Sequence, residues 1–346
     1  MFHMFQFGFL TQSQNRFDFE LIDVWTIVLT LFVIGLLFVL LLIGRVLKRQ
    51  PESKFDQDVI RLFNKQVTSW LMICVVLLVA LLLNKVVTVM LFGIVSFWAL
   101  REFITMTPTR RGDHRTLFWV FLGFTPLQYV LVAYGLYDYY TIVIPVYASL
   151  FIPARIAFTS DHKRFLERTA KIQFGLLICV YALSHAAALV NLQLNTWDSL
   201  QQAYVPWDGK PAGLLFFLIV VVQFSEMLHF FWDRIAGKHL IAATIDQAKS
   251  WEGLIGAGVC AAIFGSLLQL TFNNLTPFSW YAAGLMSLLI SVMASSGSMT
   301  MAAIKRDRGI GTYGTLVTGH LGVLDRIDAV CFAAPIFFHV TRILLT

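Results

Sequence analysis

Long runs without a charged residue alternate with short charged stretches along the chain. The four clearest runs contain 19 to 26 uncharged residues and cover positions 24–44, 66–84, 116–137 and 172–197. About 20 residues of helix, at about 1.5 Å of rise per residue, cross a hydrocarbon core of roughly 30 Å. Each of these runs therefore predicts one membrane-spanning helix.

The longest uncharged stretch must contain two helices. Between Glu252 and Lys305 there are 52 residues without a charge, and one helix of that length would extend about 78 Å. The segment 273–277 has two Asn and a Pro, which favour a turn at that point. The chain must therefore fold back there.

Shorter apolar runs complete the set, with slight extension at their ends: 86–100, 139–154, 212–224 and 329–341. The pattern predicts an all-α polytopic membrane protein of about ten transmembrane helices, or nine if the pair around residue 84 is one re-entrant unit. Composition supports this interpretation, because 58% of the residues are hydrophobic and 13% are charged. A soluble domain carries about 25% charged residues.

The positive charges indicate which loops share one side of the membrane. Of the 26 Lys and Arg residues, 22 fall in alternate loops at 45–68, 101–115, 155–171, 233–251 and 303–327. The positive-inside rule places these loops in the cytoplasm and the N-terminus outside. This orientation explains the net charge of +6 without a nucleic-acid partner, and none is predicted.

The chain divides into two predicted parts. Residues 1–68 hold an N-terminal interfacial segment, the first transmembrane anchor and a cytoplasmic loop, and residues 69–346 form one integral-membrane domain. Basic residues at span ends are mostly explained by topology. Arg155 is most simply such an anchor, although it could reach a lipid phosphate.

The last cytoplasmic segment is the richest in candidate chemistry. It starts at Lys305, continues through a Gly-rich stretch, and ends with the segment from His320 to Asp328, which includes Asp325. Transfer of a nucleotidyl group needs cations for phosphate oxygens, carboxylates for Mg²⁺ and exposed backbone N–H groups. The alternative is that the cations only fix the orientation of the chain in the membrane, and that Asp325 and Asp328 are capping residues at the start of the last helix. The two interpretations are equal for Lys305 alone, whereas function is favoured for the segment from His320 to Asp328.

The preceding cytoplasmic loop supplies a second cluster. Glu226 lies near the end of an apolar span, where a buried carboxylate is costly and therefore marks a candidate site. His229 and Asp233 follow at three and seven positions, on the same helical face. Glu226 could instead be an interface residue that reaches water, and we expect Asp233 and Arg234 to be solvated.

Together the two clusters resemble the phosphatidate cytidylyltransferase (CDP-diglyceride synthase) family, in one bacterial branch, over roughly residues 70–346. The terminal signature of that family is matched in spacing by Lys305-Arg306, Gly314, His320, Gly322, Asp325, Arg326 and Asp328. Its upstream pattern is echoed by Glu226, Gly237-Lys238-His239 and Lys249-Ser250-Trp251-Glu252-Gly253.

The resemblance implies transfer of CMP from CTP to phosphatidate, with Mg²⁺ as cofactor, at the cytoplasmic face of a bacterial inner membrane. It implies catalytic roles for Lys305, Arg306, His320, Asp325 and Arg326. It further implies substrate contacts from Lys238, Lys249, Ser250, Gly319 and Gly322, and metal ligation by Glu226, Asp325 and Asp328. The partners would be CTP, phosphatidate or a related anionic lipid, and the bilayer. The oligomeric state stays open, a homodimer included.

Several family carboxylates are replaced here, and this keeps other functions open. The family's Lys-Asp pair is Gly311-Thr312, and no acidic residue occurs in 297–302, where the family has two. A degenerate homologue that binds anionic lipid or nucleotide, or an enzyme for another lipid phosphate, is the alternative. A transporter ranks third, because the polar residues cluster in loops rather than near the bilayer midplane.

Overall fold

The structure is a computed structural model that describes residues 22–48, 57–106, 109–159, 161–198, 203–272, 274–309 and 322–346. Seven helices are continuous: α1 (Val24–Leu47), α2 (Gln57–Leu83), α3 (Lys85–Thr105), α10 (Ala212–Ala236), α11 (Trp251–Thr271), α12 (Trp280–Arg308) and α13 (Leu324–Leu345). The N-terminal interfacial segment predicted from the sequence lies almost wholly outside the described residues.

Three further membrane-length segments each contain a π-helical turn in the middle. They are α4 (His114–Trp119) joined through Val120–Phe124 to α5 (Thr125–Ala133), α6 (Tyr137–Ile142) joined through Val143–Ala148 to α7 (Ser149–Ala157), and α8 (Phe165–Leu176) joined through Leu177–Ala182 to α9 (Leu183–Ala188). Short 3₁₀ turns occupy Arg111–Asp113 and Leu189–Asn191. Such π turns widen a helix locally without ending it.

The predicted transmembrane architecture is confirmed. Within the described part of the chain, nine helical segments are long and apolar enough to cross a membrane, and α2 adds the shorter apolar stretch Val67–Leu83. Asn84 separates α2 from α3, and its side chain accepts a hydrogen bond from the Val87 N–H at 2.9 Å. Because α3 is itself long enough to span, the two runs around residue 84 are two helices.

The predicted turn in the long uncharged stretch is also present. Helix α11 ends at Thr271 and α12 begins at Trp280. The two helices then pack closely, because a Cβ on Gly265 would lie 1.9 Å from Ser287 Oγ. Small residues at such crossings let membrane helices approach each other.

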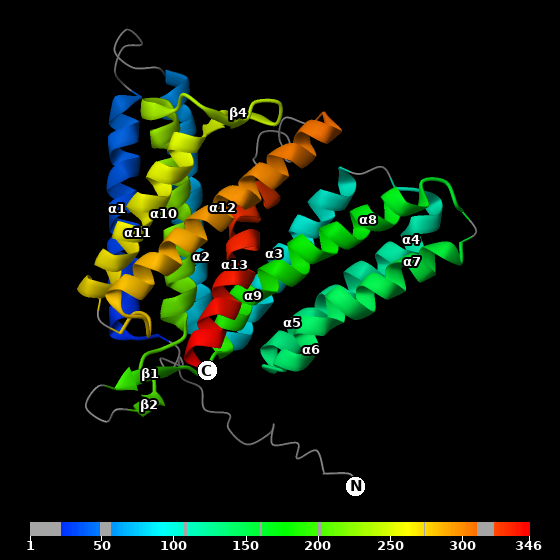
Figure 1. Cartoon of the computed structure of the whole chain (residues 1–346), viewed down its shortest axis with the longest axis horizontal. Coiled ribbons are helices and arrows are strands. Elements are labelled where there is room, and N and C mark those ends of the chain that lie inside the picture. The colour runs from blue at the N-terminus through cyan, green and yellow to red at the C-terminus, as the bar shows by residue number, and fades with distance from the viewer. Residues whose placement is uncertain are drawn as a thin grey trace.

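The first half of helix α10 is fully enclosed within the bundle. Every residue from Ala212 to Val222 is buried, including the adjacent Phe216 and Phe217. Figure 1 shows α10 beside α1 and α11, with α12 crossing obliquely and α4–α9 forming the other side of the molecule. Glu226 and His229 therefore follow a fully enclosed half-helix.

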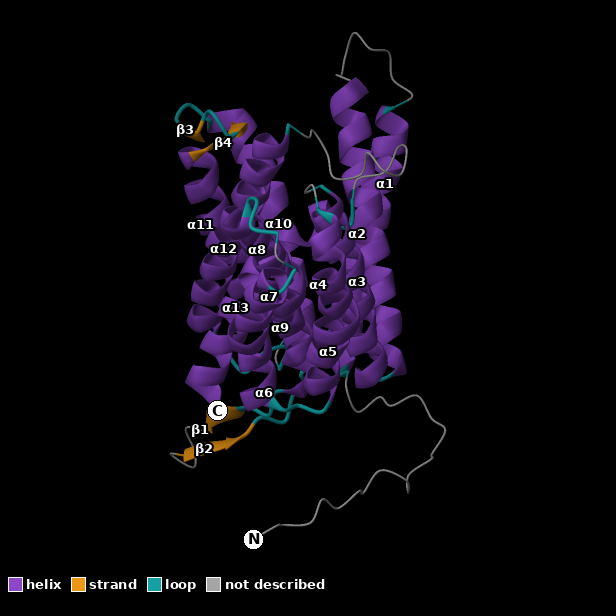
Figure 2. Cartoon of the chain, turned by 90° about the vertical axis from the view of Figure 1, so that its right-hand side faces the viewer, coloured by secondary structure: helices purple, strands orange, loops and turns teal. Residues whose placement is uncertain are grey.

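Two small hairpins mark opposite ends of the bundle (Figure 2). Strands β1 (Asn195–Asp198) and β2 (Ala203–Pro206) pair antiparallel at one end, and β3 (Leu240–Ala242) and β4 (Asp246–Ser250) pair antiparallel at the other. We call the end with β3 and β4 the basic end, because it carries the described parts of the basic loops. Its assignment to the cytoplasm, with the N-terminus outside, stays a prediction, as does the division at residue 68.

Candidate active site

The two predicted clusters meet at the basic end. Glu226, near the end of α10, is partly buried, and the charges that act on its carboxylate are those of Lys249 on β4 and Arg326 on α13. Arg326 in turn interacts with Asp325, Glu226 and Asp328. Residues 100 positions apart in the sequence therefore share one charged region at the edge of the apolar bundle.

Helices α12 and α13 contribute a second contact to this region. Lys305 Nζ lies 2.5 Å from Asp325 Oδ1, and only 6% of the Asp325 side chain is exposed. Asp328 is buried, its Oδ1 accepts the Ala329 N–H at 2.8 Å, and the charges of Glu226 and Asp325 act on it. Carboxylates that would repel one another are thus held together by Lys305 and Arg326.

A glycine permits this close approach of α12 and α13. A Cβ on Gly297 would lie 2.7 Å from the Asp328 carbonyl oxygen and 3.1 Å from Phe332 Cβ. The first distance is shorter than any normal contact of a Cβ atom. The role of Gly297 in this structure is therefore close packing of α12 against α13.

The start of α13 is fixed by a residue that the sequence did not reveal. The Glu102 carboxylate, at the end of α3, accepts hydrogen bonds from the backbone N–H groups of Val323 at 3.1 Å and Leu324 at 2.9 Å. Val323 provides no side-chain cap of its own. Because the first N–H groups of a helix lack intrahelical partners, Glu102 replaces the missing cap. A carboxylate in a basic loop was the only signal, and its partner is 221 residues away.

Asp233 corrects an expectation. We expected it to be solvated, but only 10% of its side chain is exposed. Its Oδ1 accepts the Ser250 N–H at 2.9 Å and the Ser250 hydroxyl at 2.6 Å. Ser250 Oγ also accepts the Gly253 N–H at 3.0 Å and caps α11. The hairpin folds back over the end of α10, and this covers Asp233. Arg234 is exposed, as expected, and lies over the Phe230 ring.

Glu252 holds the segment that leads into the hairpin, at Lys238 and His239. Its carboxylate accepts the backbone N–H groups of Lys238 and His239 at 3.2 and 3.1 Å, and it lies 2.5 Å from His239 Nδ1. This holds the Gly-Lys-His segment against the start of α11. The Lys238 side chain is exposed at the basic end.

A polar chain continues from the site into the bundle. His229 Nε2 lies 2.6 Å from Ser295 Oγ, and His229 Nδ1 lies 3.7 Å from Asp233 Oδ2. One turn further in, Ser225 Oγ is 2.5 Å from Ser291 Oγ. The predicted helical face of Glu226, His229 and Asp233 is therefore turned toward α12 and the hairpin.

The other predicted site residues are placed as follows. Arg306 is exposed in the last turn of α12, and Gly322 is buried just before α13. His320 and Gly319, with most of the Gly-rich stretch, lie outside the described residues. Among the residues that the structure describes, no three His, Cys, Asp or Glu side chains form a group suited to hold a metal ion. The role of Glu226, Asp325 and Asp328 as metal ligands stays a prediction.

The fold and the site define an integral-membrane protein that gathers cations and carboxylates from α10, β4, α12 and α13 at one end of its bundle. Residues 64–344 match the model of the Cytidylyltransferase family, and the chain belongs to that family. The family resemblance found in the sequence is thereby confirmed.

Relatives are of two kinds. The uncharacterized protein YnbB of Escherichia coli (strain K12) is 31% identical over 314 residues, which are 90% of this chain and 96% of YnbB. The phosphatidate cytidylyltransferase of Haemophilus influenzae is 32% identical over 126 residues, 36% of this chain and 44% of that protein. That of Mycobacterium leprae is 34% identical over 131 residues, 38% of this chain and 40% of that protein. This chain thus spans less than half the length of these two enzymes.

Proposed function

We propose that this protein transfers CMP from CTP to phosphatidate, giving CDP-diacylglycerol and pyrophosphate. The family membership supports a nucleotidyl transfer that uses CTP, and two relatives bear the name phosphatidate cytidylyltransferase. One observation carries the proposal. Charged residues from distant segments lie together at the end of a membrane bundle: Glu226, Lys249, Arg326 and the Lys305–Asp325 pair. A water-soluble nucleotide and a lipid phosphate can both reach such a place.

The reaction needs positioning and charge neutralisation rather than a covalent intermediate. An oxygen of the lipid phosphate attacks the α-phosphorus of CTP, the bond from that phosphorus to the bridging oxygen breaks, and pyrophosphate leaves with the electron pair. Lys249, Lys305 and Arg306 would contact phosphate oxygens, and Arg326 would orient the carboxylates or the lipid head. Lys305 is held by Asp325 in advance, so its charge is already in place when phosphate arrives.

Magnesium and the cellular location remain part of the proposal. Glu226, Asp325 and Asp328 would be the ligands of Mg²⁺, although the described residues do not gather them into one group. We place the basic end at the cytoplasmic face of a bacterial inner membrane, because the predicted orientation follows the positive charges.

A second candidate is a homologue that binds anionic lipid or nucleotide without turnover, or acts on another lipid phosphate. It is favoured by the absence of a carboxylate in residues 297–302 and of a metal-type group among the described side chains. The near full-length relative, YnbB, is itself uncharacterized.

Two substitutions separate the candidates. Glu226→Gln and Asp325→Asn keep side-chain size and remove one charge each. We expect both to lower CMP transfer at least about 100-fold, within the range for a positioned group in the transition state. Asp138→Asn, exposed at the opposite end at the start of α6, is the control and should keep full turnover. Unchanged turnover in Glu226→Gln and Asp325→Asn would refute the assignment of the site. A wild-type protein that binds CTP but forms no product would favour the second candidate.

A further inference from the structure

A cavity away from the candidate active site opens at the basic end of α4 and α7. It has a volume of about 370 Å³ and is lined by His114, Arg115, Phe118, Trp119 and Arg155. None of these residues belongs to the site built from α10, β4, α12 and α13. Three of the five carry a positive charge or can acquire one, and none is acidic.

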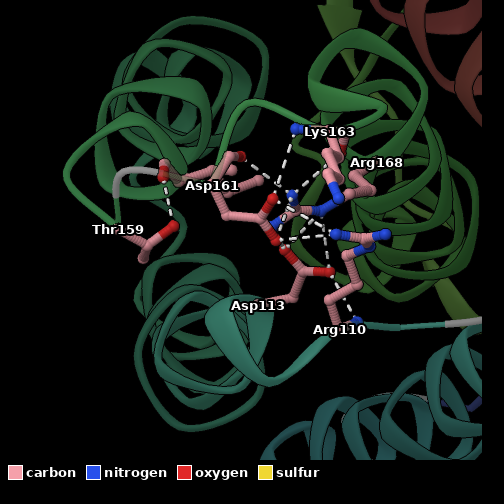
Figure 3. A network of polar contacts seen from close by, with 7 residues as sticks. Arg110, Asp113, Thr159, Asp161, Lys163 and Arg168 are labelled. Atoms are coloured by element: carbon pink, nitrogen blue, oxygen red, sulfur yellow. Dashed lines mark hydrogen bonds and ion pairs between the residues drawn. The ribbon is translucent and has the colours of Figure 1, made fainter.

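Neighbouring arginines at the same end have carboxylate partners, as Figure 3 shows. Arg168 pairs with the buried Asp113 and lies 3.1 Å from Asp161 Oδ2, and Arg110 lies 3.2 Å from the same Asp161 oxygen. Desolvation raises the pKa of Asp161, but its hydrogen bonds from Arg110 and Lys163 and the charges of Arg110 and Arg168 outweigh this and keep that pKa below its usual value. Asp113 and Asp161 are therefore already paired with arginines outside the cavity lining.

The arginines that line the cavity are not part of this network. No ion pair formed among the described residues includes Arg115 or Arg155. Arg155 is half-buried at the end of α7, whereas Arg115 is exposed on α4. Two uncompensated guanidinium groups beside one cavity favour an anionic occupant, and a guanidinium matches the geometry of phosphate oxygens.

The cations and the aromatic rings that line the cavity lie at different depths. Phe118 and Trp119 follow His114 and Arg115 by four positions each, so an aromatic ring lies one helical turn, about 6 Å, deeper than each cation. Both rings are about half exposed, at 56% and 50%. Charge at the surface with exposed aromatic rings beneath it matches an amphiphile whose phosphate lies at the interface and whose chains enter the apolar layer.

We propose that this cavity binds the headgroup phosphate of an anionic glycerophospholipid from the leaflet at the basic end. Arg115 and Arg155 hold the phosphate, His114 contributes at the rim, and Phe118 and Trp119 contact the glycerol and upper acyl chains. The site is distinct from the one that takes part in CMP transfer, and it recognises a phosphodiester lipid as well as a phosphomonoester.

The test uses the full chain in nanodiscs with equal amounts of phosphatidylglycerol and phosphatidylcholine, and native mass spectrometry counts the lipids retained on the released protein. The variant is Arg115→Gln with Arg155→Gln. The control is Arg45→Gln with Lys48→Gln, which removes two exposed charges from the same end at α1. We expect the variant to lose about tenfold in preference for phosphatidylglycerol, because both guanidinium groups that would bind the phosphate are removed. The control should keep the preference. Equal retention of phosphatidylglycerol by the variant and the control would show that Arg115 and Arg155 only help to orient the chain in the membrane. That result would overturn the proposal.

A second measurement does not depend on how the arginine variant folds. Emission specific to Trp119 is the difference between wild type and Trp119→Phe. Phosphatidylglycerol with brominated chains should quench it more than brominated phosphatidylcholine at the same fraction. Equal quenching by the two lipids would also contradict the proposal.

Failure of this proposal can be told apart from failure of the proposed function. Phosphatidylglycerol has no phosphomonoester to accept CMP, so its retention is measured without any turnover. Glu226→Gln should lower CMP transfer at least about 100-fold and leave phosphatidylglycerol retention unchanged. Loss of retention in Glu226→Gln would mean that the lipid occupies the candidate active site instead, and this outcome too would overturn the separate cavity.

Discussion

The close crossing of α12 and α13 at Gly297 makes a quantitative prediction. The change Gly297→Ala adds one methyl group, and its carbon would lie 2.7 Å from the Asp328 carbonyl oxygen and 3.1 Å from Phe332 Cβ. The nearer atom belongs to the backbone and cannot rotate away. The helices must therefore separate by several tenths of an ångström, and the start of α13 must move with them.

The expected cost follows from packing. Overpacking by one methyl group in a well-packed core costs about 1–3 kcal/mol, and we expect about 2 kcal/mol, the middle of that range, for this clash. Alanine is a better helix former than glycine by about 1 kcal/mol, and this offsets part of the loss. The net destabilisation should therefore be about 1 kcal/mol or more.

Gly35→Ala is the matched control, because a Cβ at Gly35 in α1 meets no atom within 4 Å. Unfolding of both variants in the same detergent is followed by circular dichroism against increasing denaturant. Gly35→Ala should be neutral or stabilising, whereas Gly297→Ala should unfold earlier and also lose CMP transfer. Equal stability of the two variants would refute the close crossing on which the position of Asp328 depends.

Three further substitutions test single contacts. Glu102→Ala removes the cap of α13 and should cost about 2 kcal/mol, as for charge-assisted hydrogen bonds to backbone N–H groups; thermal unfolding measures this, and no change would contradict the cap. Asp113→Asn leaves the buried Arg168 without its main partner and should cost about 3 kcal/mol; hydrogen exchange at the start of α8 should rise, and unchanged protection would count against the pair. Ser250→Ala removes the cap of α11 and should cost about 1 kcal/mol; a variant that unfolds at the wild-type denaturant concentration would show that the cap contributes nothing.

The helices could be predicted from the sequence because the bilayer imposes their length. Each predicted uncharged run corresponds to a helix, and the turn near residue 274 falls where two Asn and a Pro break the apolar pattern. The three π turns were not predicted, because hydrophobicity does not distinguish a π turn from an α turn. The two hairpins were not predicted either, because their strands are only three to five residues long and carry too little of an alternating pattern.

The site could be predicted in part. The pairing of Glu226 with residues of the last segment follows from the family resemblance, since no helical period relates positions 226 and 326. The role of Glu102 and the burial of Asp233 depend on how distant segments fold back, and local sequence carries no signal of that. His320 and Gly319 lie outside the described residues, so their roles stay predictions.

The most direct test of the central claim is product formation by the wild-type protein. Purified full-length chain is incubated in liposomes with phosphatidate, Mg²⁺ and CTP labelled in the cytidine, and the lipid extract is examined for labelled CDP-diacylglycerol. Parallel samples omit phosphatidate or contain EDTA. We predict a labelled lipid that requires phosphatidate and the metal, with pyrophosphate released in equal amount. CTP binding without any labelled lipid, under conditions in which the Haemophilus influenzae relative forms it, would contradict the proposed transfer.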